Sequence, residues 1–354
     1  MTYLDANASE PLRPAARAAV LAALDQNGNP SSVHGTGRAA RRILDRARQV
    51  LAAGYGVDAD DVVFTSGGTE ANALAIVGLR GARRVIVGAT EHDAVRQATP
   101  DATILPVDPD GVVCLVALEQ LLMVGPALVC VMAANNETGT RQPLSVVAAL
   151  CARHGALLHV DAVQSRVAFD MRALGATSVA LSAHKMGGPL GAGALLLAGA
   201  DPAPLIRGGG QERGRRGGTP ALPAIAGFAA VVGADWPDLT PLRDAIERAA
   251  VAQGAIVLGG PDRLPNTSCL ALPGMRADAQ VIALDLAGVQ VSAGAACSSG
   301  IVGESHVLRA MGSDWVGQAI RVSLPWSATT ASVDAFTVAY ARLCSRVDRV
   351  LLPG

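Results

Sequence analysis

Short apolar runs alternate with helical patterns through the first 200 residues, and this alternation limits the fold more than any other feature. Helical periodicity is clearest over 37–55, where Ala40, Leu44, Ala47 and Leu51 share one face and arginines occupy the other. Helices are also expected over 70–77, 115–122 and 144–154, and strands over 62–65, 84–87, 103–107, 127–132, 156–160, 178–181 and 194–197. Such strands, apolar on both faces, predict an α/β fold with a mainly parallel sheet covered by helices.

The pattern changes after Gly208-Gly-Gly210, where longer helices and fewer strands follow. Helices are expected over 220–233, 241–253, 277–286 and 332–350, and strands over 255–258, 268–272 and 320–324. Pro237 and Pro241 interrupt the pattern between the first two helices. We therefore predict a large domain over 1–237 and a smaller C-terminal α+β domain over 238–354, and we leave open whether the first residues pack on the small domain.

Composition excludes several classes of partner. Half of the 354 residues are hydrophobic, which is enough for a sizeable core, and the formal net charge is −1. A chain with this charge lacks the basic surface that nucleic acid or an anionic membrane requires. No apolar run reaches the roughly 20 residues of a membrane span, and the first residues do not resemble a signal peptide. We expect a cytoplasmic protein with neither kind of partner.

Lys185 is the only lysine, so 28 of the 29 basic residues are arginine. Arginine replaces lysine in solvation and ion pairing, but its guanidinium does not form an ordinary imine with an aldehyde. The lone lysine therefore suggests a chemical role, although a surface lysine retained by chance is the simpler alternative. The six cysteines show no zinc-type spacing, and Cys297 alone lies in a small, polar, loop-like stretch.

Polar residues follow the predicted strands, where ligands bind in open parallel sheets. The stretch from Ser66 to Asn72 suits a phosphate at a helix N-terminus, or it is simply a capped helix start. His92 and the pair Asn135-Asn136 have equally plain interpretations as loop and turn residues. Asp161 ends a buried strand, where an unpaired charge is costly, so we expect a cationic partner for it.

Lys185 follows the next strand, at the same end of the sheet as these residues. Pyridoxal 5'-phosphate combines an aldehyde, a phosphate, an aromatic ring and a basic ring nitrogen, and would satisfy the whole set. Lys185 would form the imine, Asp161 would hold the pyridinium proton and His92 would stack on the ring. A dinucleotide-binding dehydrogenase is a weaker hypothesis, because no GxGxxG follows the first predicted strand.

The motifs resemble those of a known enzyme family. They are TSGGTEAN (65–72), NNETG (135–139), HVDAVQ (159–164), SAHK (182–185), GGGQERGRRGGT (208–219) and AACSS (295–299). In order and spacing they are similar to the cysteine desulfurases of the NifS and IscS type, within the class V aminotransferase group of fold-type I pyridoxal-phosphate enzymes. Ser9-Glu10 departs from the family's more usual pair of threonines.

The resemblance implies a role for each matching residue. Lys185 would be the Schiff-base lysine, Cys297 the nucleophile, and Arg321 the partner of the substrate carboxylate. The remaining implied contacts to the cofactor come from Gly68, Thr69, His92, Asn136, Asp161, Gln164, Ser182, His184 and, from the second subunit of a homodimer, Thr219. Asn136 would also contact the substrate.

The implied reaction converts L-cysteine to L-alanine. Its sulfur would pass to a persulfide on Cys297 and then to an acceptor, such as an iron–sulfur scaffold protein. No metal site is expected, apart from transient iron–sulfur ligation by Cys297. The alternatives are a selenocysteine lyase or another class V aminotransferase or lyase, and a catalytically inactive scaffold for sulfur-transfer partners. A loop thiol favours the desulfurase over an aminotransferase, which has no use for one.

Overall fold

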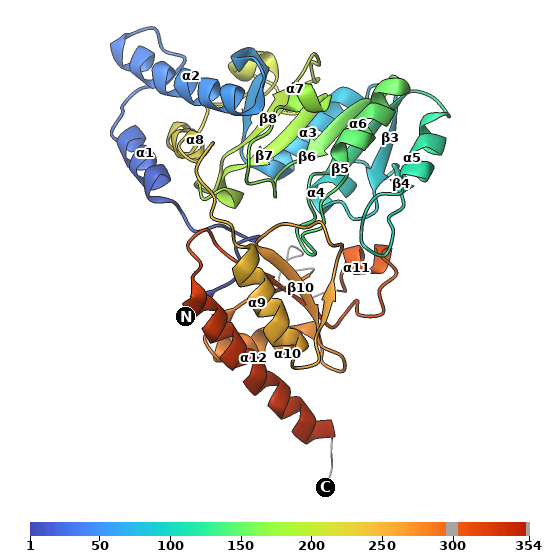
Figure 1. Ribbon diagram of the computed structural model, residues 1–354. Coiled ribbons are helices and arrows are strands. Elements are labelled where there is room, and N and C mark those ends of the chain that lie inside the picture. The colour runs from blue at the N-terminus through green and yellow to red at the C-terminus, as the bar shows by residue number, and fades with distance from the viewer. Residues whose placement is uncertain (295–303, 352–354) are drawn as a thin grey trace.

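The computed structural model describes residues 1–294 and 304–351, with side chains up to residue 345. Two lobes are stacked along the long axis of the molecule (Figure 1). The larger lobe holds a seven-stranded sheet between helices, and the smaller one a four-stranded sheet.

The large sheet has the order β2-β8-β7-β6-β5-β3-β4. Its strands are β2 (Val62–Thr65), β3 (Arg84–Gly88), β4 (Thr103–Leu105), β5 (Ala127–Met132), β6 (Leu157–Asp161), β7 (Ser178–Ser182) and β8 (Gly193–Leu197). All pairs are parallel except those of β8 with β2 and β7. The connection from β7 to β8, residues 183–192, is shorter than the dozen or so residues of a parallel crossover, so β8 runs back. The predicted α/β fold with a mainly parallel sheet is confirmed.

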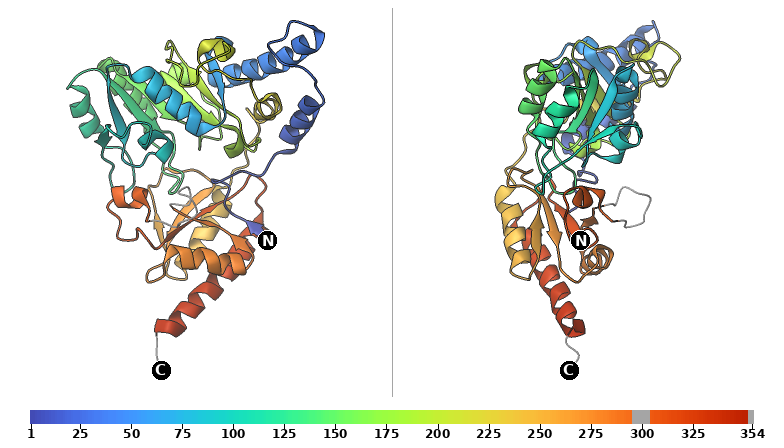
Figure 2. Two further views of the ribbon diagram at one scale, coloured as in Figure 1. Left: turned by 180° about the vertical axis from the view of Figure 1, so that it is seen from behind. Right: turned by 90° about the vertical axis from the view of Figure 1, so that its right-hand side faces the viewer.

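Helices cover both faces of this sheet. The helix α3 (Gly68–Arg80) lies in front of it in the left view of Figure 2, with the short α4 (Asp93–Arg96) beside it, whereas α6 (Leu144–Arg153) lies in front in Figure 1. On the face of α6 are also α2 (Gly35–Tyr55), α5 (Leu115–Leu122), α7 (Met171–Leu174) and α8 (Leu222–Ala229). Side chains alternate along β5, so Val129 and Val131 join one apolar cluster while Leu128 and Cys130 join the other.

The small lobe is built on an antiparallel sheet of order β12-β13-β10-β9. Its strands are β9 (Ile256–Leu258), β10 (Thr267–Ala271), β12 (Ser292–Ala293) and β13 (Ala319–Ser323), and its helices are α9 (Thr240–Val251), α10 (Ala277–Leu286), α11 (His306–Ala310) and α12 (Thr330–Leu351). The strand β1 (Thr2–Tyr3) pairs with β11 (Val289–Gln290), and Leu4 is buried in this lobe's core. We propose a domain boundary near residue 237, supported by a core that draws on residues from Leu239 onward together with Leu4.

The helix α1 (Pro14–Leu24) was not predicted from the sequence, nor were the short helices α4, α7 and α11. Of its residues only Ala16 and Ala23 are buried, so α1 carries no apolar stripe that a 3.6-residue period would reveal. The other three span too few residues for such a period. Among the described residues, no helix is long and apolar enough to cross a membrane.

A buried ion pair between Arg48 and Glu212 lies beside β2, at the edge of the large sheet. The guanidinium of Arg48 lies 2.8 and 2.9 Å from the carboxylate oxygens of Glu212, and the same carboxylate accepts the backbone N–H of Phe64 at 2.8 Å. The two side chains are exposed to only 7% and 2%. The pair therefore ties α2 and the segment around Glu212 to β2.

We predict that Arg48→Ala lowers the free energy of unfolding by about 3–5 kcal/mol, because it leaves the Glu212 carboxylate buried without a counter-ion. Urea denaturation followed by circular dichroism measures this. The control is Arg41→Ala, which removes an exposed pair with Asp45 and should cost less than about 0.5 kcal/mol. Equal losses in the two variants would contradict the assignment.

Candidate active site

The carboxyl ends of β6 and β7 lie side by side and carry the central residues of the site. Asp161 is the last residue of β6. Lys185 ends a 3₁₀ turn (Ala183–Lys185) that follows β7 directly. The start of α3 approaches the same place, since a Cβ atom built on Gly68 would lie 2.5 Å from Val163 and 3.5 Å from Ser182. The sheet thus brings three predicted motifs together.

Asp161 is a buried carboxylate held by neutral donors. Its Oδ1 accepts the backbone N–H of Val163 at 2.9 Å, and its Oδ2 accepts Nδ2 of Asn72 at 2.9 Å. Burial raises the pKa of Asp161, while the Val163 N–H, His92, Asn72 and Lys185 act in the opposite direction. The expected cationic partner is not among the ion pairs of the described residues. A carboxylate in this setting can accept one further, charged donor.

A relay of side chains sets the orientation of Asn72. Its Oδ1 lies 2.8 Å from Nε2 of His159, whose Nδ1 lies 2.9 Å from Oγ of Ser178. Burial lowers the pKa of His159 to about 3, so the imidazole is neutral. Because Asn72 donates to Asp161, its oxygen faces His159, so Nε2 carries the proton and Nδ1 accepts from Ser178. The relay from Ser178 through His159 and Asn72 ends with a donor on Asp161.

Glu91 lies behind this carboxylate. Its Oε1 accepts the backbone N–H of Met132 at 2.7 Å, and the side chain is buried. Burial, reinforced by the nearby charge of Asp161, raises the pKa of Glu91 well above its usual value. The neutral form of Glu91 is thus favoured by its burial and by the nearby Asp161.

The N-terminus of α3 and the end of β7 form a setting for an anion. The first turn of α3 presents free backbone N–H groups, with Gly68 buried at the start and Thr69 exposed next to it. Ser182 Oγ lies 3.1 Å from Nδ1 of His184. Burial and the neighbouring Lys185 lower the pKa of His184 to about 4, so its ring is neutral at pH 7.

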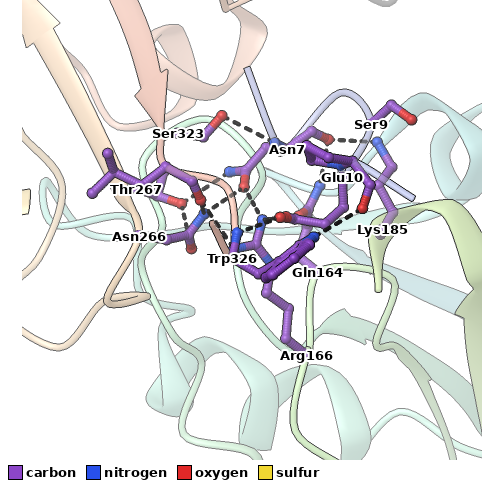
Figure 3. A network of polar contacts seen from close by, with 12 residues as sticks. Asn7, Ser9, Glu10, Gln164, Arg166, Lys185, Asn266, Thr267, Ser323 and Trp326 are labelled. Atoms are coloured by element: carbon purple, nitrogen blue, oxygen red, sulfur yellow. Dashed lines mark hydrogen bonds and ion pairs between the residues drawn. The ribbon is translucent and has the colours of Figure 1, made fainter. Parts of the chain in front are cut away.

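The Lys185 amine contacts the N-terminal segment of the chain. Its Nζ donates to the carbonyl oxygen of Asn7 at 2.5 Å (Figure 3). It also donates to the carbonyl oxygen of Ala8 at 3.0 Å. Gln164 also donates to the Asn7 carbonyl, at 3.1 Å, and its own Oε1 is buried without a hydrogen-bond partner in the described part of the chain. His92 is the N-cap of α4, where its Nδ1 accepts the backbone N–H of Ala94 at 3.0 Å.

Arg321, from β13 of the small lobe, reaches the same region. Its Nη2 lies 2.7 Å from Oδ1 of Asp5, and its Nη1 donates to the backbone carbonyl of Asn136 at 3.2 Å. The side chain is 3% exposed, and its Nε has no acceptor among the described residues. The guanidinium therefore retains donors for a further acceptor.

One predicted residue is not brought together with the others, and one falls outside the part of the chain that the structure describes. Thr219 is exposed, at the end of a segment that Arg216 attaches to Glu70 of α3 through a 2.8 Å ion pair. Its predicted place in a second subunit stays a prediction. Cys297 lies outside the described residues.

Several residues near the site were not predicted from sequence. Asn7, Asn72, Glu91 and Asp5 each make a buried or part-buried contact to a predicted residue or its neighbour. Asn72 had a detectable signal, since it falls one helical turn after Gly68 and therefore on the inward face of α3. Asp5 and Asn7 lie in the stretch where the resemblance to the family begins, but their contacts could not be predicted, because their partners are more than 100 residues away.

Comparisons with known proteins agree with this geometry. The family model of class V aminotransferases matches residues 2–336. The chain belongs to this family. A cysteine desulfurase from Cereibacter sphaeroides is 43% identical over 94% of this chain and 92% of its own length. An IscS-like cysteine desulfurase from Mycobacterium tuberculosis is 36% identical over 99% and 98%.

Solved structures of similar proteins have the same fold. A NifS-like protein from Rickettsia africae superimposes with a TM-score of 0.90 at 30% identity, covering 97% of this chain and 99% of its own. The structure described as SspA in complex with cysteine superimposes with a TM-score of 0.80 at 26% identity, over 92% and 99%. The predicted small lobe and fold-type I architecture are confirmed.

We predict that His159→Gln changes how stability depends on pH. The unfolded chain protonates this histidine below about pH 6.5, whereas the folded chain with a pKa of about 3 does not. Stability contributed by neutral His159 is therefore present above pH 6.5 and is lost as the pH falls. Between pH 7 and pH 5 the wild type should lose about 2 kcal/mol more than the variant in urea unfolding. An equal loss in both proteins would show that His159 is not held neutral.

Proposed function

We propose that this protein is a pyridoxal 5'-phosphate-dependent cysteine desulfurase. It would convert L-cysteine to L-alanine and transfer the sulfur to Cys297 as a persulfide, for delivery to an acceptor in iron–sulfur cluster or other sulfur-cofactor synthesis. The observation that carries the proposal is the convergence of the lone lysine, a buried carboxylate and a helix N-terminus at one end of the sheet. The family and the names of the relatives support it.

The residues present fit the cofactor. Asp161 is buried among neutral donors and lacks a cationic partner among the described ion pairs, so a protonated ring nitrogen would complete its surroundings. Gly68 and Thr69 offer the first turn of α3 to a phosphate, with Ser182 and His184 beside it. His92, Asn136 and Gln164 are proposed to contact the ring. When bound, the cofactor supplies an electron-withdrawing ring that labilises bonds at the α-carbon of an amino acid linked to it.

The chain's own residues would bind the substrate and move protons. Arg321 would bind the carboxylate of L-cysteine, for which the fork of a guanidinium is well shaped. The Lys185 amine would take and return protons at the substrate carbons, with its position set by the carbonyl oxygens of Asn7 and Ala8. His92 is the N-cap of α4, which follows the carboxyl end of β3 in the same sheet.

Cys297 would act as the nucleophile toward the substrate sulfur. Its thiolate forms an S–S bond while the C–S bond of cysteine breaks, and the released carbon is protonated to give alanine. The products are one alanine and one persulfide, so neither an oxidant nor a reductant is needed for this step. We include in the proposal a homodimer in which Thr219 of the partner subunit reaches the phosphate.

We predict that the purified, cofactor-loaded protein forms alanine from L-cysteine, and sulfide when a thiol reductant is present. Lys185→Ala should abolish alanine formation, and Cys297→Ala should abolish sulfide release. Cys114→Ser is the matched control, because Cys114 is a partly exposed cysteine in the large lobe that plays no part in the proposal, and its activity should equal the wild type. Substantial sulfide release by Cys297→Ala would overturn the nucleophile, and absence of alanine from the wild type would overturn the proposed function.

We predict that Arg321→Gln raises the KM for L-cysteine about 10- to 100-fold, because a charge-assisted contact to the carboxylate is replaced by a neutral one. Steady-state alanine formation measures it. Arg263→Gln is the comparison: Arg263 is a part-buried arginine of the same lobe, paired with Glu247, and its loss should leave KM unchanged. An unaltered KM in Arg321→Gln would remove this residue from substrate binding.

A further inference from the structure

The side chain of Asn7 uses every hydrogen-bonding position it has. Its Nδ2 donates to the Asn136 carbonyl at 3.1 Å and to Oγ1 of Thr267 at 2.9 Å. Its Oδ1 accepts from Nη2 of Arg166 at 3.1 Å and Nδ2 of Asn266 at 3.2 Å. An asparagine amide offers two donors and two acceptor positions, and all four are engaged. Figure 3 shows Asn7 among its partners Thr267, Asn266 and Arg166. The side chain is 1% exposed, so this residue is held in a single orientation.

The backbone of Asn7 is in turn the support for the lysine. Its carbonyl oxygen accepts from Nζ of Lys185 and from Gln164, while its N–H donates to Oγ of Ser323 at 3.0 Å. The Ala8 carbonyl, one residue further, is the second acceptor for the same amine. Displacement of the Asn7 side chain would therefore move both acceptors of the lysine.

The same segment contacts the guanidinium on the other side of the site. Asp5 pairs with Nη2 of Arg321 at 2.7 Å, and the Asn136 carbonyl accepts from both Asn7 Nδ2 and Arg321 Nη1. Lys185 belongs to the large lobe and Arg321 to the small one. Residues 5–8 thus lie between two groups that come from different lobes.

This placement matters because the substrate of the proposed reaction is small. The amine must reach the carbons of the same molecule whose carboxylate the guanidinium holds, and an error of about 1 Å in such an arrangement can lower a rate about 100-fold. The strands β7 and β13 belong to different sheets, so no strand pairing fixes their relative position. The distance between Lys185 and Arg321 therefore depends on the residues that connect the two lobes.

We propose that Asn7 is a positioning residue that sets the place of the Lys185 amine relative to Arg321, so that the N-terminal segment is a working part of the catalytic centre. The expected effect of Asn7 on the rate of turnover rests on the proposed function. The hydrogen bonds that hold the Lys185 amine do not depend on which reaction the protein catalyses.

The single lysine makes that hold measurable without activity. Only the unprotonated amine reacts with an acylating reagent, and two carbonyl acceptors favour the protonated form. In full-length protein stripped of cofactor, acetylation of Lys185 by N-hydroxysuccinimidyl acetate can be followed by peptide mass spectrometry. Asn7→Ala should accelerate it at least threefold at a fixed pH near 8.

Two comparisons separate positioning from stability. Gln280→Ala removes another fully buried amide, which donates to the carbonyls of Met275 and Gln318 in the small lobe, away from the lysine. It should lower the melting temperature to a similar degree but leave the acetylation rate of Lys185 unchanged. Thr267→Val removes the hydroxyl that accepts from Asn7 and donates to Asn266, and should raise the rate less than Asn7→Ala does. Thr267→Ser, which keeps the hydroxyl, should restore the wild-type rate.

In the cofactor-loaded enzyme, Asn7→Ala should both lower kcat for alanine formation and raise the KM for L-cysteine at least fivefold, because the amine and the guanidinium shift relative to each other. A loss of folded protein alone would lower kcat and leave KM unchanged. Acetylation of Lys185 at the wild-type rate in both Asn7→Ala and Thr267→Val would overturn the inference. Absence of alanine from the wild type, with altered acetylation in the variants, would overturn the proposed function and leave the hold on the amine established.

Discussion

The structure depends on how a carboxylate is kept at the end of a buried parallel strand. Asp161 cannot be solvated there, so its charge requires donors supplied by the protein. They come from the Val163 N–H and from Asn72, whose orientation is set by neutral His159. Burial and the nearby Asp161 raise the pKa of Glu91 well above its usual value, which favours its neutral form. The helix α3, three strands and the turn after β6 must therefore pack in one arrangement, and this arrangement also places Lys185 and the N-terminus of α3.

The two lobes meet through the N-terminal segment. Leu4 is anchored in the core of the small lobe, and within a few residues the chain contacts Lys185 and Gln164 of the large one. The pair of Asp5 and Arg321 joins residues 316 positions apart. A site assembled in this way is sensitive to the packing between the lobes, and the buried amide of Asn7 is the point where the contacts of both lobes converge.

Glu10, where the resemblance to the family leads us to expect a threonine, belongs to a second buried cluster. Its carboxylate lies 3.0 Å from Arg166, and it accepts the backbone N–H of Trp326. The Arg13 guanidinium stacks 4.4 Å from the ring of Trp236 and 5.0 Å from that of Trp326. Since Arg166 also donates to Asn7, this cluster extends the network around the lysine rather than competing with it. The buried carboxylate of Glu10 thus has its own counter-ion.

The periodicity of apolar residues was sufficient to predict β2, β5, α5 and α10 to the residue, and the order of motifs was sufficient to place Lys185 and Asp161 at one end of the sheet. These features depend on residues close together in the chain. A repeat of apolar residues every 2.0 positions indicates a strand, and one every 3.6 positions indicates a helix. The tertiary structure alone decided three further features. They are the reversed direction of β8, the neutral relay of side chains behind Asp161, and the position of residues 5–8 between Lys185 and Arg321. Each joins groups far apart in sequence, and hydrogen-bond geometry between such groups exists only once the lobes have packed.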